Sequence, residues 1–167
     1  MTTVYVKLTG LAEKWTKPCQ HAATRLNALF KQNNIDVVLA LRGSREPTIT
    51  VKTDSTIQGD LVHGKTSADY SDSGKMLSAE VRLPVNVTIN TPQGIRDAGP
   101  GVLEVIAGHE FVHALGHSGH NSKLMGQTMQ KSMGDKASGD QLKAGDVAMP
   151  PLQLSSESIS NLKGIWK

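Results

Sequence analysis

A short stretch of the sequence carries the residues best suited to chemistry, because His109, Glu110 and His113 form a His-Glu-x-x-His motif. On a helix, residues four apart differ by about 40° in azimuth and about 6 Å in height, so both imidazoles can point at one ion. Glu110 is rotated about 100° from His109, which keeps it off the ion but near a water molecule there. The motif therefore predicts a hydrolytic metal site on a helix.

A third ligand has to come from the chain that follows the motif, where His117 and His120 are both available. Gly116 is placed to end the helix in a left-handed conformation, after which the chain can double back. If the helix continued, the Cα of His117 would stand about 12 Å along the axis from that of His109, too far for a shared ion with bonds of about 2.0–2.1 Å. If the helix stops at Gly116, His117 has little chain for a reversal. We therefore favour His120 as the third ligand, with His117 as the alternative.

These residues resemble a known family. The run from His109 to Gly116, followed closely by another histidine, is similar to the zinc motif of the metzincin metallopeptidases, and Leu124-Met125 is similar to their methionine turn. Residues 150–155, followed by a short helix that ends at Ile165-Trp166, resemble the end of a matrixin-type catalytic domain. The specific resemblance covers residues 101–125 and 149–166.

The sequence departs from the family pattern at two places. The family has its third histidine three residues after the glycine, which here is Gly119, and one inserted residue restores the match with His120. The stretch between Met125 and Met149 is longer than the family's usual link to the last helix. The resemblance implies Zn²⁺ on His109, His113 and His120, Glu110 as the general base, and a peptide or protein as substrate.

Composition favours a compact enzyme of one domain that spans residues 1–167. The net charge is +3 and the Lys and Arg residues are scattered, so nucleic acid is not an expected partner. The single cysteine, Cys19, excludes an internal disulfide and argues against a zinc finger. We expect it to be a small buried residue on a helix, and we expect the protein to be a monomer.

The N-terminus, residues 1–8, lacks the long apolar run of a signal peptide and has the alternation of a strand. No segment approaches 18 consecutive apolar residues, so no membrane span is expected. A peptidase without a leader or a propeptide is exported by another route, packaged with a partner, or represented by its mature part. The sequence leaves its location open.

The order of elements predicts an α+β fold with a twisted mixed sheet, a long first helix, an active-site helix and a C-terminal helix. Pro18 suits the first turn of the first helix, which Asn33-Asn34 ends. The strands predicted before the motif are residues 4–8, an interior strand at 35–41, and residues 48–53. Residues 54–75 have the composition of a surface loop, with a little strand around Leu61-Val62.

Residues 79–90 form an unusually long alternation of apolar and polar side chains, and Pro84 within them suits an edge strand. An extended substrate could add to such an edge, so residues 79–85 are the expected substrate strand. The active-site helix is predicted from about Val102 to Leu115. Residues 126–148 are interpreted as a mobile flap, and Ser155 as the cap of the last helix.

Two other functional interpretations stay open. One is a zinc peptidase of another clan in which Glu157 is the third ligand, although this residue also suits the first turn of its helix. The other is a metal-binding module without catalysis, against which Glu110 argues, since a structural site needs no acid–base group. Tyr70 and His63 are candidate catalytic helpers by residue type alone.

Overall fold

The computed structural model describes residues 1–59, 64–91, 94–125, 142–144, 147–149 and 152–167. The fold is α+β, as the sequence predicted, with a mixed five-stranded sheet and helices. The helices are α1 (Glu13–Gln32), α2 (Pro100–Ala114), the 3-10 helix η1 (Lys123–Met125) and α4 (Ser156–Ile165). The sheet strands are β1 (Thr2–Leu8), β2 (Val37–Ala40), β3 (Thr48–Thr53), β4 (Lys65–Tyr70) and β5 (Met76–Leu83).

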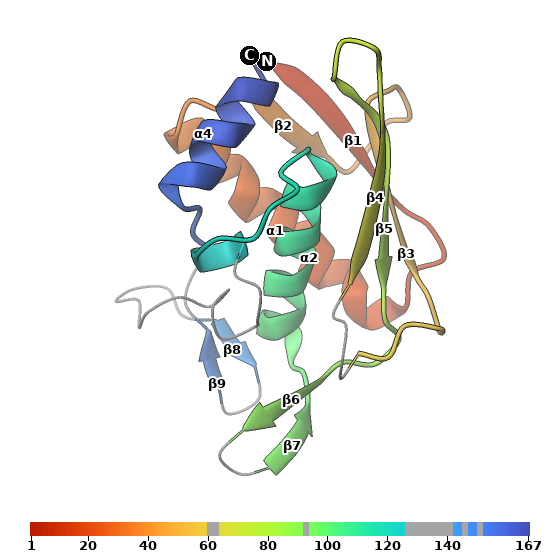
Figure 1. Cartoon of the computed structure of the whole chain (residues 1–167). Coiled ribbons are helices and arrows are strands. Elements are labelled where there is room, and N and C mark those ends of the chain that lie inside the picture. Colours follow the sequence, from red (N-terminus) through yellow and green to blue (C-terminus); the bar gives the residue numbers. More distant parts are fainter. Residues whose placement is uncertain (60–63, 92–93, 126–141, 145–146, 150–151) are drawn as a thin grey trace.

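The sheet has the strand order β2-β1-β3-β5-β4, in which only β4 runs antiparallel to its neighbour. Two small hairpins complete the described strands: β6 (Thr88–Thr91) with β7 (Gly94–Asp97), and β8 (Leu142–Ala144) with β9 (Val147–Met149). In Figure 1, α1 and α2 cover one face of the sheet, and α4 lies on the other side of these helices. The two ends of the chain lie close together.

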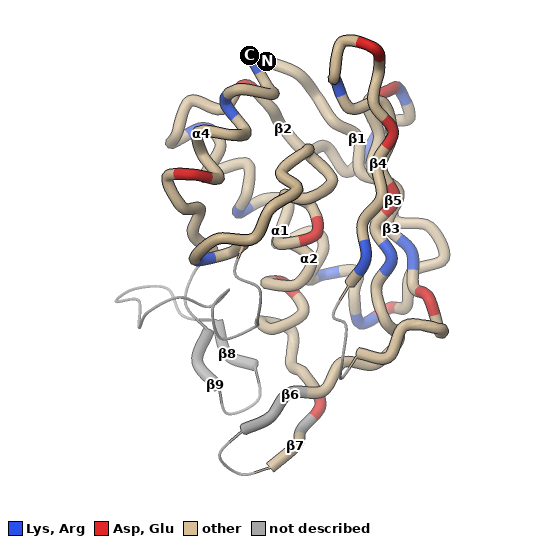
Figure 2. The backbone as a smooth tube through the Cα atoms, viewed as in Figure 1, with Lys and Arg blue, Asp and Glu red and all other residues tan. Residues whose placement is uncertain are grey.

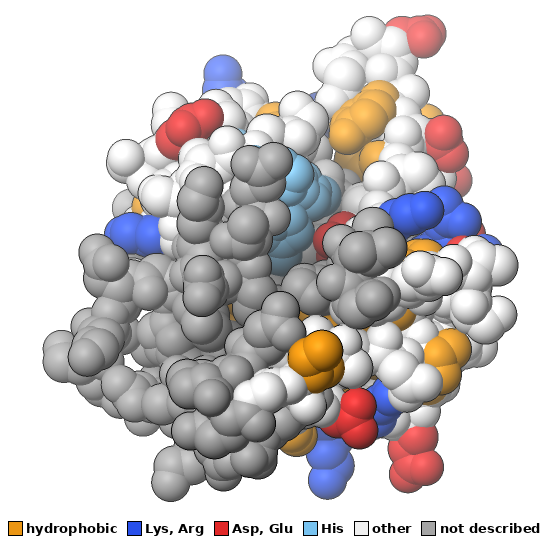
Figure 3. All heavy atoms as spheres, turned by 60° about the horizontal axis from the view of Figure 1, so that its bottom comes forward, with side chains coloured by type: hydrophobic (Ala, Val, Ile, Leu, Met, Phe, Trp, Pro, Cys, Tyr) orange, Lys and Arg blue, Asp and Glu red, His pale blue; other side chains and the backbone are white. Residues whose placement is uncertain are grey.

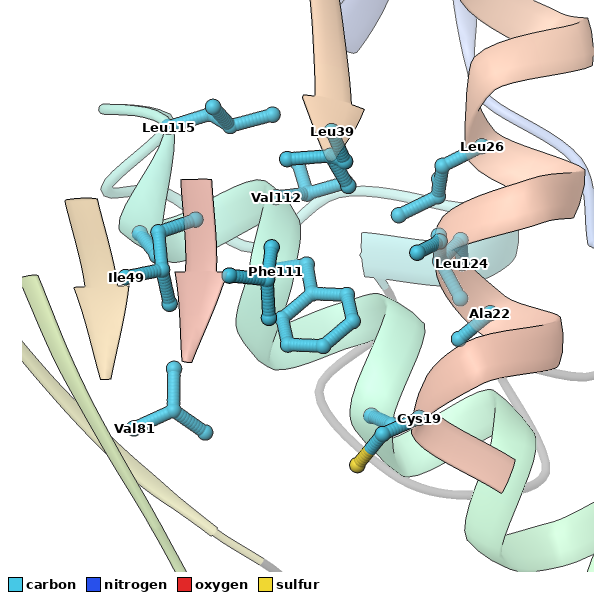
Figure 4. Close-up of a cluster of buried hydrophobic side chains, with 14 of the residues drawn as sticks. Cys19, Ala22, Leu26, Leu39, Ile49, Val81, Phe111, Val112, Leu115 and Leu124 are labelled. Carbon is cyan, nitrogen blue, oxygen red and sulfur yellow. The ribbon is translucent and has the colours of Figure 1, made fainter. Parts of the chain in front are cut away.

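The core lies between the sheet and the two long helices. Figure 4 shows Phe111 of α2 between strand residues such as Ile49 and Val81 and the facing residues of α1, among them Cys19 and Leu26. Cys19 is completely buried on α1, as expected, and burial raises the pKa of its thiol to about 12. The thiol is therefore an inert core group at neutral pH.

Helix α1 begins earlier than predicted, because it starts at Glu13 and Pro18 lies inside the helix rather than in its first turn. The reason is the indole of Trp15, which is completely buried and donates from Nε1 to the carbonyl of Pro84 at 2.8 Å. A buried aromatic ring of this size outweighs the local cost of the proline. The extra turn also fixes the chain just after β5.

Strand β2 was predicted as an interior strand, and this was wrong, because it is an edge of the sheet. Its backbone at Leu39 does not remain unpaired. The side chain of Asn27 on α1 donates to the carbonyl of Leu39 at 2.9 Å and accepts from its N–H at 2.8 Å. This amide takes the place of a neighbouring strand, which lets an apolar strand end the sheet.

The substrate-edge prediction was also wrong. Strand β5 holds residues 79–83 but lies between β3 and β4, so it is interior. Pro84 follows its last residue and ends the strand instead of marking an edge. The edge is β4, which falls in the segment predicted as loop, whereas Leu61-Val62 lie outside the described residues. Strand β4 could not be recognised from its polar sequence, because pairing with β5 and not an apolar face holds it in the sheet.

Helix α2 is buried on nearly all sides, which is typical of a helix enclosed by other elements. It runs from Pro100 to Ala114, close to the predicted range. Helix α4 is capped as predicted, since the hydroxyl of Ser155 accepts from the N–H of Ser158 at 3.1 Å. Its C-terminal Trp166 donates from Nε1 to the carbonyl of Leu115 at 2.9 Å, which ties α4 to the end of α2.

Charged residues are spread over the described surface (Figure 2), with one basic row across the sheet. Lys52, Arg82 and Lys65 are register neighbours on β3, β5 and β4. Glu80 and Asp54 form ion pairs with two members of this row, at 2.9 Å to Lys52 and 3.1 Å to Arg82. Among the described residues, no helix is both long and apolar enough to cross a membrane.

Candidate metal centre

Three histidines from two segments converge at the C-terminal end of α2. His109 and His113 lie one turn apart on this helix, and their Nε2 atoms are 3.0 Å from each other. Gly116, with a φ of +106°, lets the chain turn after the helix. The turn brings the Nε2 of His120 to 3.3 Å from that of His113, and one nitrogen from each ring lies within 4.8 Å of the other two.

In two of these rings, the hydrogen bond made by Nδ1 determines which nitrogen carries the proton. The Nδ1–H of His109 donates to the carbonyl of Leu124 at 2.8 Å, and that of His113 donates to the carbonyl of His117 at 2.6 Å. A carbonyl oxygen can only accept, so the proton of each neutral imidazole is on Nδ1. Each Nε2 therefore carries a bare lone pair, which is the form that binds a metal ion.

This arrangement fits a metal ion better than it fits hydrogen bonds among the rings. Two bare Nε2 atoms, such as those of His109 and His113, cannot bond to each other, and lone pairs aimed at one point need a cation between them. In a tetrahedral zinc site with bonds of about 2.05 Å, neighbouring ligand nitrogens are about 3.3 Å apart. The 3.0 and 3.3 Å found for two of the pairs are near this spacing, and the three nitrogens all lie within 4.8 Å of one another. The three imidazoles could therefore hold a metal ion such as Zn²⁺.

The electrostatics of the cluster favour neutral rings. Burial lowers the pKa of His109 to about 4, and it also lowers the pKa of His120. Protons therefore compete weakly for His109 at neutral pH, and a metal ion meets a ligand that is already deprotonated. Figure 3 shows that histidine side chains reach the surface together, with an acidic side chain beside them.

Glu110 lies next to the cluster without joining it. It does not belong to the three-histidine group, and it is only 6% exposed. Burial raises the pKa of its carboxyl, while a hydrogen bond from Thr66 and the nearby His113 act in the opposite direction. A carboxyl group beside a group of histidines that could hold a metal ion is placed to act as an acid–base group.

The ring of His117 does not reach the other three. It is 2% exposed, and its two nitrogens lie 3.2 Å from Nδ2 of Asn121 and 3.1 Å from Nδ2 of Asn161. It contributes to the centre through its backbone carbonyl, which accepts from His113. The structure thus brings His120, the favoured residue, to His109 and His113, and leaves His117 in a network that connects the loop to α4.

The remaining sequence candidates lie elsewhere. Glu157 is in the first turn of α4, where it acts electrostatically on His117, and it does not belong to the three-histidine group among the described residues. Tyr70 is at the end of β4 and half exposed. His63 and most of residues 126–148 lie outside the described residues, so the flap interpretation is not tested.

Sequence reasoning missed two residues that touch the carboxyl group. Thr66 on β4 donates from Oγ1 to Oε2 of Glu110, and Gly64 lies directly against the same carboxyl. Neither residue could have been found from the sequence, because both are in a polar segment without the alternation of a strand. Only the pairing of β4 with β5 brings them to α2.

The sequence matches no protein-family model, and no curated protein matches it significantly. The residues of the site itself are therefore the basis on which its function is inferred.

Proposed function

We propose that this protein is a zinc-dependent endopeptidase of metzincin type, in which His109, His113 and His120 hold Zn²⁺ and Glu110 is the general base. The observation that carries the proposal is which nitrogen of the His109 and His113 rings carries the proton. Two Nδ1–H groups are taken by backbone carbonyls, so the Nε2 lone pairs that face each other are left for a cation. Three imidazoles and one open position are typical of a catalytic zinc site.

Two features beyond the ligands support the family assignment. The carbonyl that orients His109 belongs to Leu124 in η1, and the next residue, Met125, is completely buried. The loop from Asn121 to Met125 is closed by a backbone hydrogen bond of 2.9 Å. This is the place at which the sequence resembles a methionine turn.

The chemistry follows from the positions of the residues. Zn²⁺ at the three imidazoles would lower the pKa of a water molecule toward 7 and polarise the carbonyl of the scissile bond. Glu110 takes a proton from the attacking water and delivers it to the nitrogen of the leaving amine as the C–N bond breaks. Burial of Glu110 keeps the carboxyl out of bulk water and raises its pKa.

A peptide substrate is favoured by the edge of the sheet. Strand β4 pairs only with β5 among the described residues, and its Thr66 touches the general base. An extended peptide that adds to β4 would have its backbone alongside the catalytic carboxyl. This edge replaces the one expected at residues 79–85.

The test combines metal content with hydrolysis. The purified chain of residues 1–167 is expected to contain one zinc ion and to cleave an unfolded protein such as casein, with activity lost on treatment with 1,10-phenanthroline and restored by Zn²⁺. Glu110→Gln should keep the fold and the zinc but lose activity by about 10²-fold or more, because the ligands remain while the base is gone.

The matched control is Glu157→Gln, which makes the same change outside the cluster and should leave hydrolysis intact. A protein that binds zinc but hydrolyses no peptide would be a metal-binding module, and the endopeptidase proposal would be wrong. A zinc-free protein would contradict the metal centre as well.

A further inference from the structure

The beginning of strand β4 faces α2, the helix that carries Glu110. Thr66 is the register partner of Val81, which is completely buried on the side of the sheet that faces α1 and α2. The side chain of Thr66 therefore points from the sheet edge toward α2. Its Oγ1 contacts Oε2 of Glu110 and lies 3.4 Å from the backbone carbonyl of the same residue.

The single hydroxyl proton of Thr66 goes to the carboxylate. An ionised oxygen is a stronger acceptor than a carbonyl, and the contact with Oε2 is much the shorter of the two. Within the part of the chain that the structure describes, this is the hydrogen bond that the Glu110 side chain receives. It holds Oε2 of the carboxylate in place.

Gly64 provides the room that this position of the carboxyl needs. A Cβ atom at residue 64 would lie 2.8 Å from Cγ of Glu110 and 2.9 Å from both Cδ and Oε1. These distances are shorter than any ordinary contact, so a side chain at residue 64 would displace the carboxyl. Gly64 directly precedes β4 and leaves space for the carboxyl, and Thr66 on β4 binds it.

We propose that Thr66, with the clearance provided by Gly64, positions the Glu110 carboxylate for proton transfer. The inference rests on the proposed peptidase function and makes Thr66 a positioning residue, since it acts through Glu110. It also links substrate and catalysis, because the strand that would pair with the peptide is the strand that orients the base. A merely structural bond between β4 and α2 would affect thermal stability but not turnover in the folded protein.

The kinetic experiment compares Thr66→Val, which removes the hydroxyl at nearly constant shape, with Thr66→Ser, which keeps it. Thr66→Val should lower kcat by about 10–100-fold with KM and zinc content nearly unchanged, and Thr66→Ser should restore most of the loss. Thr50→Val is the matched control, because it makes the same substitution on β3 at a position whose neighbours Ile49 and Val51 face the opposite, buried side. It should leave kcat unchanged.

Gly64→Ala tests the clearance and should lower kcat in the same way, with zinc retained. Gly164→Ala is its control, because nothing lies within 4 Å of a Cβ there. If Thr66→Val keeps the wild-type kcat, or if Thr66→Ser loses as much as Thr66→Val, the hydroxyl does not position the base and the inference is wrong.

A second readout does not depend on activity. In the metal-free protein labelled with ¹³C at the glutamate carboxyls, the signal that disappears in Glu110→Gln belongs to Glu110. This signal should shift in Thr66→Val and stay in place in Thr50→Val. Absence of a shift would overturn the contact even in an inactive protein, whereas a shift in a protein that hydrolyses nothing would preserve the contact and refute the proposed function.

Discussion

The imidazole of His113 donates its Nδ1–H to the backbone carbonyl of His117 at 2.6 Å. Because of this bond, the two histidines that follow Gly116 contribute to the cluster in different ways. His117 orients a ligand through its main chain, which any residue possesses, whereas His120 brings its ring to the cluster. The side chain of His117 is instead packed against Asn121 and Asn161.

Removal of the two side chains should therefore have different effects. His120→Ala should lose zinc during dialysis against a weak chelator, because two imidazoles remain. His117→Ala should keep most of its zinc but lose about 1–3 kcal/mol of stability, since a buried ring and the partners of two amides are removed. Metal analysis and thermal unfolding measure both effects.

Glu157→Ala serves as the control for a carboxylate ligand and should retain both zinc and activity. Loss of zinc from His117→Ala, with zinc kept in His120→Ala, would reverse the assignment of the third ligand. Loss of zinc from Glu157→Ala would contradict the metzincin interpretation.

The turn after α2 should be intolerant of a side chain at Gly116. Its φ of +106° is strained for any other residue, and a Cβ would also lie 3.0 Å from Cδ1 of Ile165. Gly116→Ala should cost about 1–3 kcal/mol in the free energy of unfolding and weaken zinc binding, because His120 follows this turn. Gly164→Ala on α4, which has neither constraint, should be neutral or stabilise by up to about 1 kcal/mol. Equal stability of the two variants would contradict this account.

The buried Glu104 on α2 should depend on Arg25 of α1. Its Oε1 lies 2.6 Å from Nε of Arg25, and the carboxylate is almost fully buried, with His21 at 3.8 Å. Arg25→Met leaves the buried carboxylate without the guanidinium that pairs with it, and it should cost about 2–3 kcal/mol at pH 7, a value reduced because Arg25 is a third exposed.

The double variant Arg25→Met/Glu104→Gln removes the charge and should recover much of this loss. The pKa of Glu104 is raised, first of all by burial, so the single variant should also regain stability as the pH falls and the carboxyl becomes neutral. Urea unfolding at several pH values measures this, and a pH-independent loss would contradict a charge effect.

The metal-free protein should lose stability on acidification through His109. The pKa of this residue is about 4 in the folded protein, against 6.5 for the free side chain, so between these values the unfolded chain binds the extra proton. The contribution of His109 is complete above about pH 6.5 and falls by at most about 1.4 kcal/mol per pH unit down to pH 4.

His109→Gln removes the titrating group and isolates this contribution. The difference in unfolding free energy between wild type and variant, measured in chelator from pH 7 to pH 4, should shrink steadily on acidification. A constant difference would mean that the ring of His109 is protonated as easily in the folded chain as in the unfolded one.

Local chemistry made much of this protein predictable from its sequence. The four-residue spacing of His109 and His113 places two ligands on one helix face, and Gly116 allows the turn that His120 needs. The α+β class, the burial of Cys19 and the cap at Ser155 follow from periodicity and side-chain type in the same way.

Tertiary structure decided everything that depends on pairing between distant segments. Strand β4 exists because β5 offers it a backbone partner, and its polar residues gave no sign of this. Strand β2 can end the sheet because the side chain of Asn27 binds the backbone of its outer edge. Strand β5 ends before Pro84, although the alternation of the sequence continues beyond it. Thr66 reaches Glu110 across 44 positions of the chain. Such contacts depend on register and on the fold of the whole domain, which no local pattern encodes.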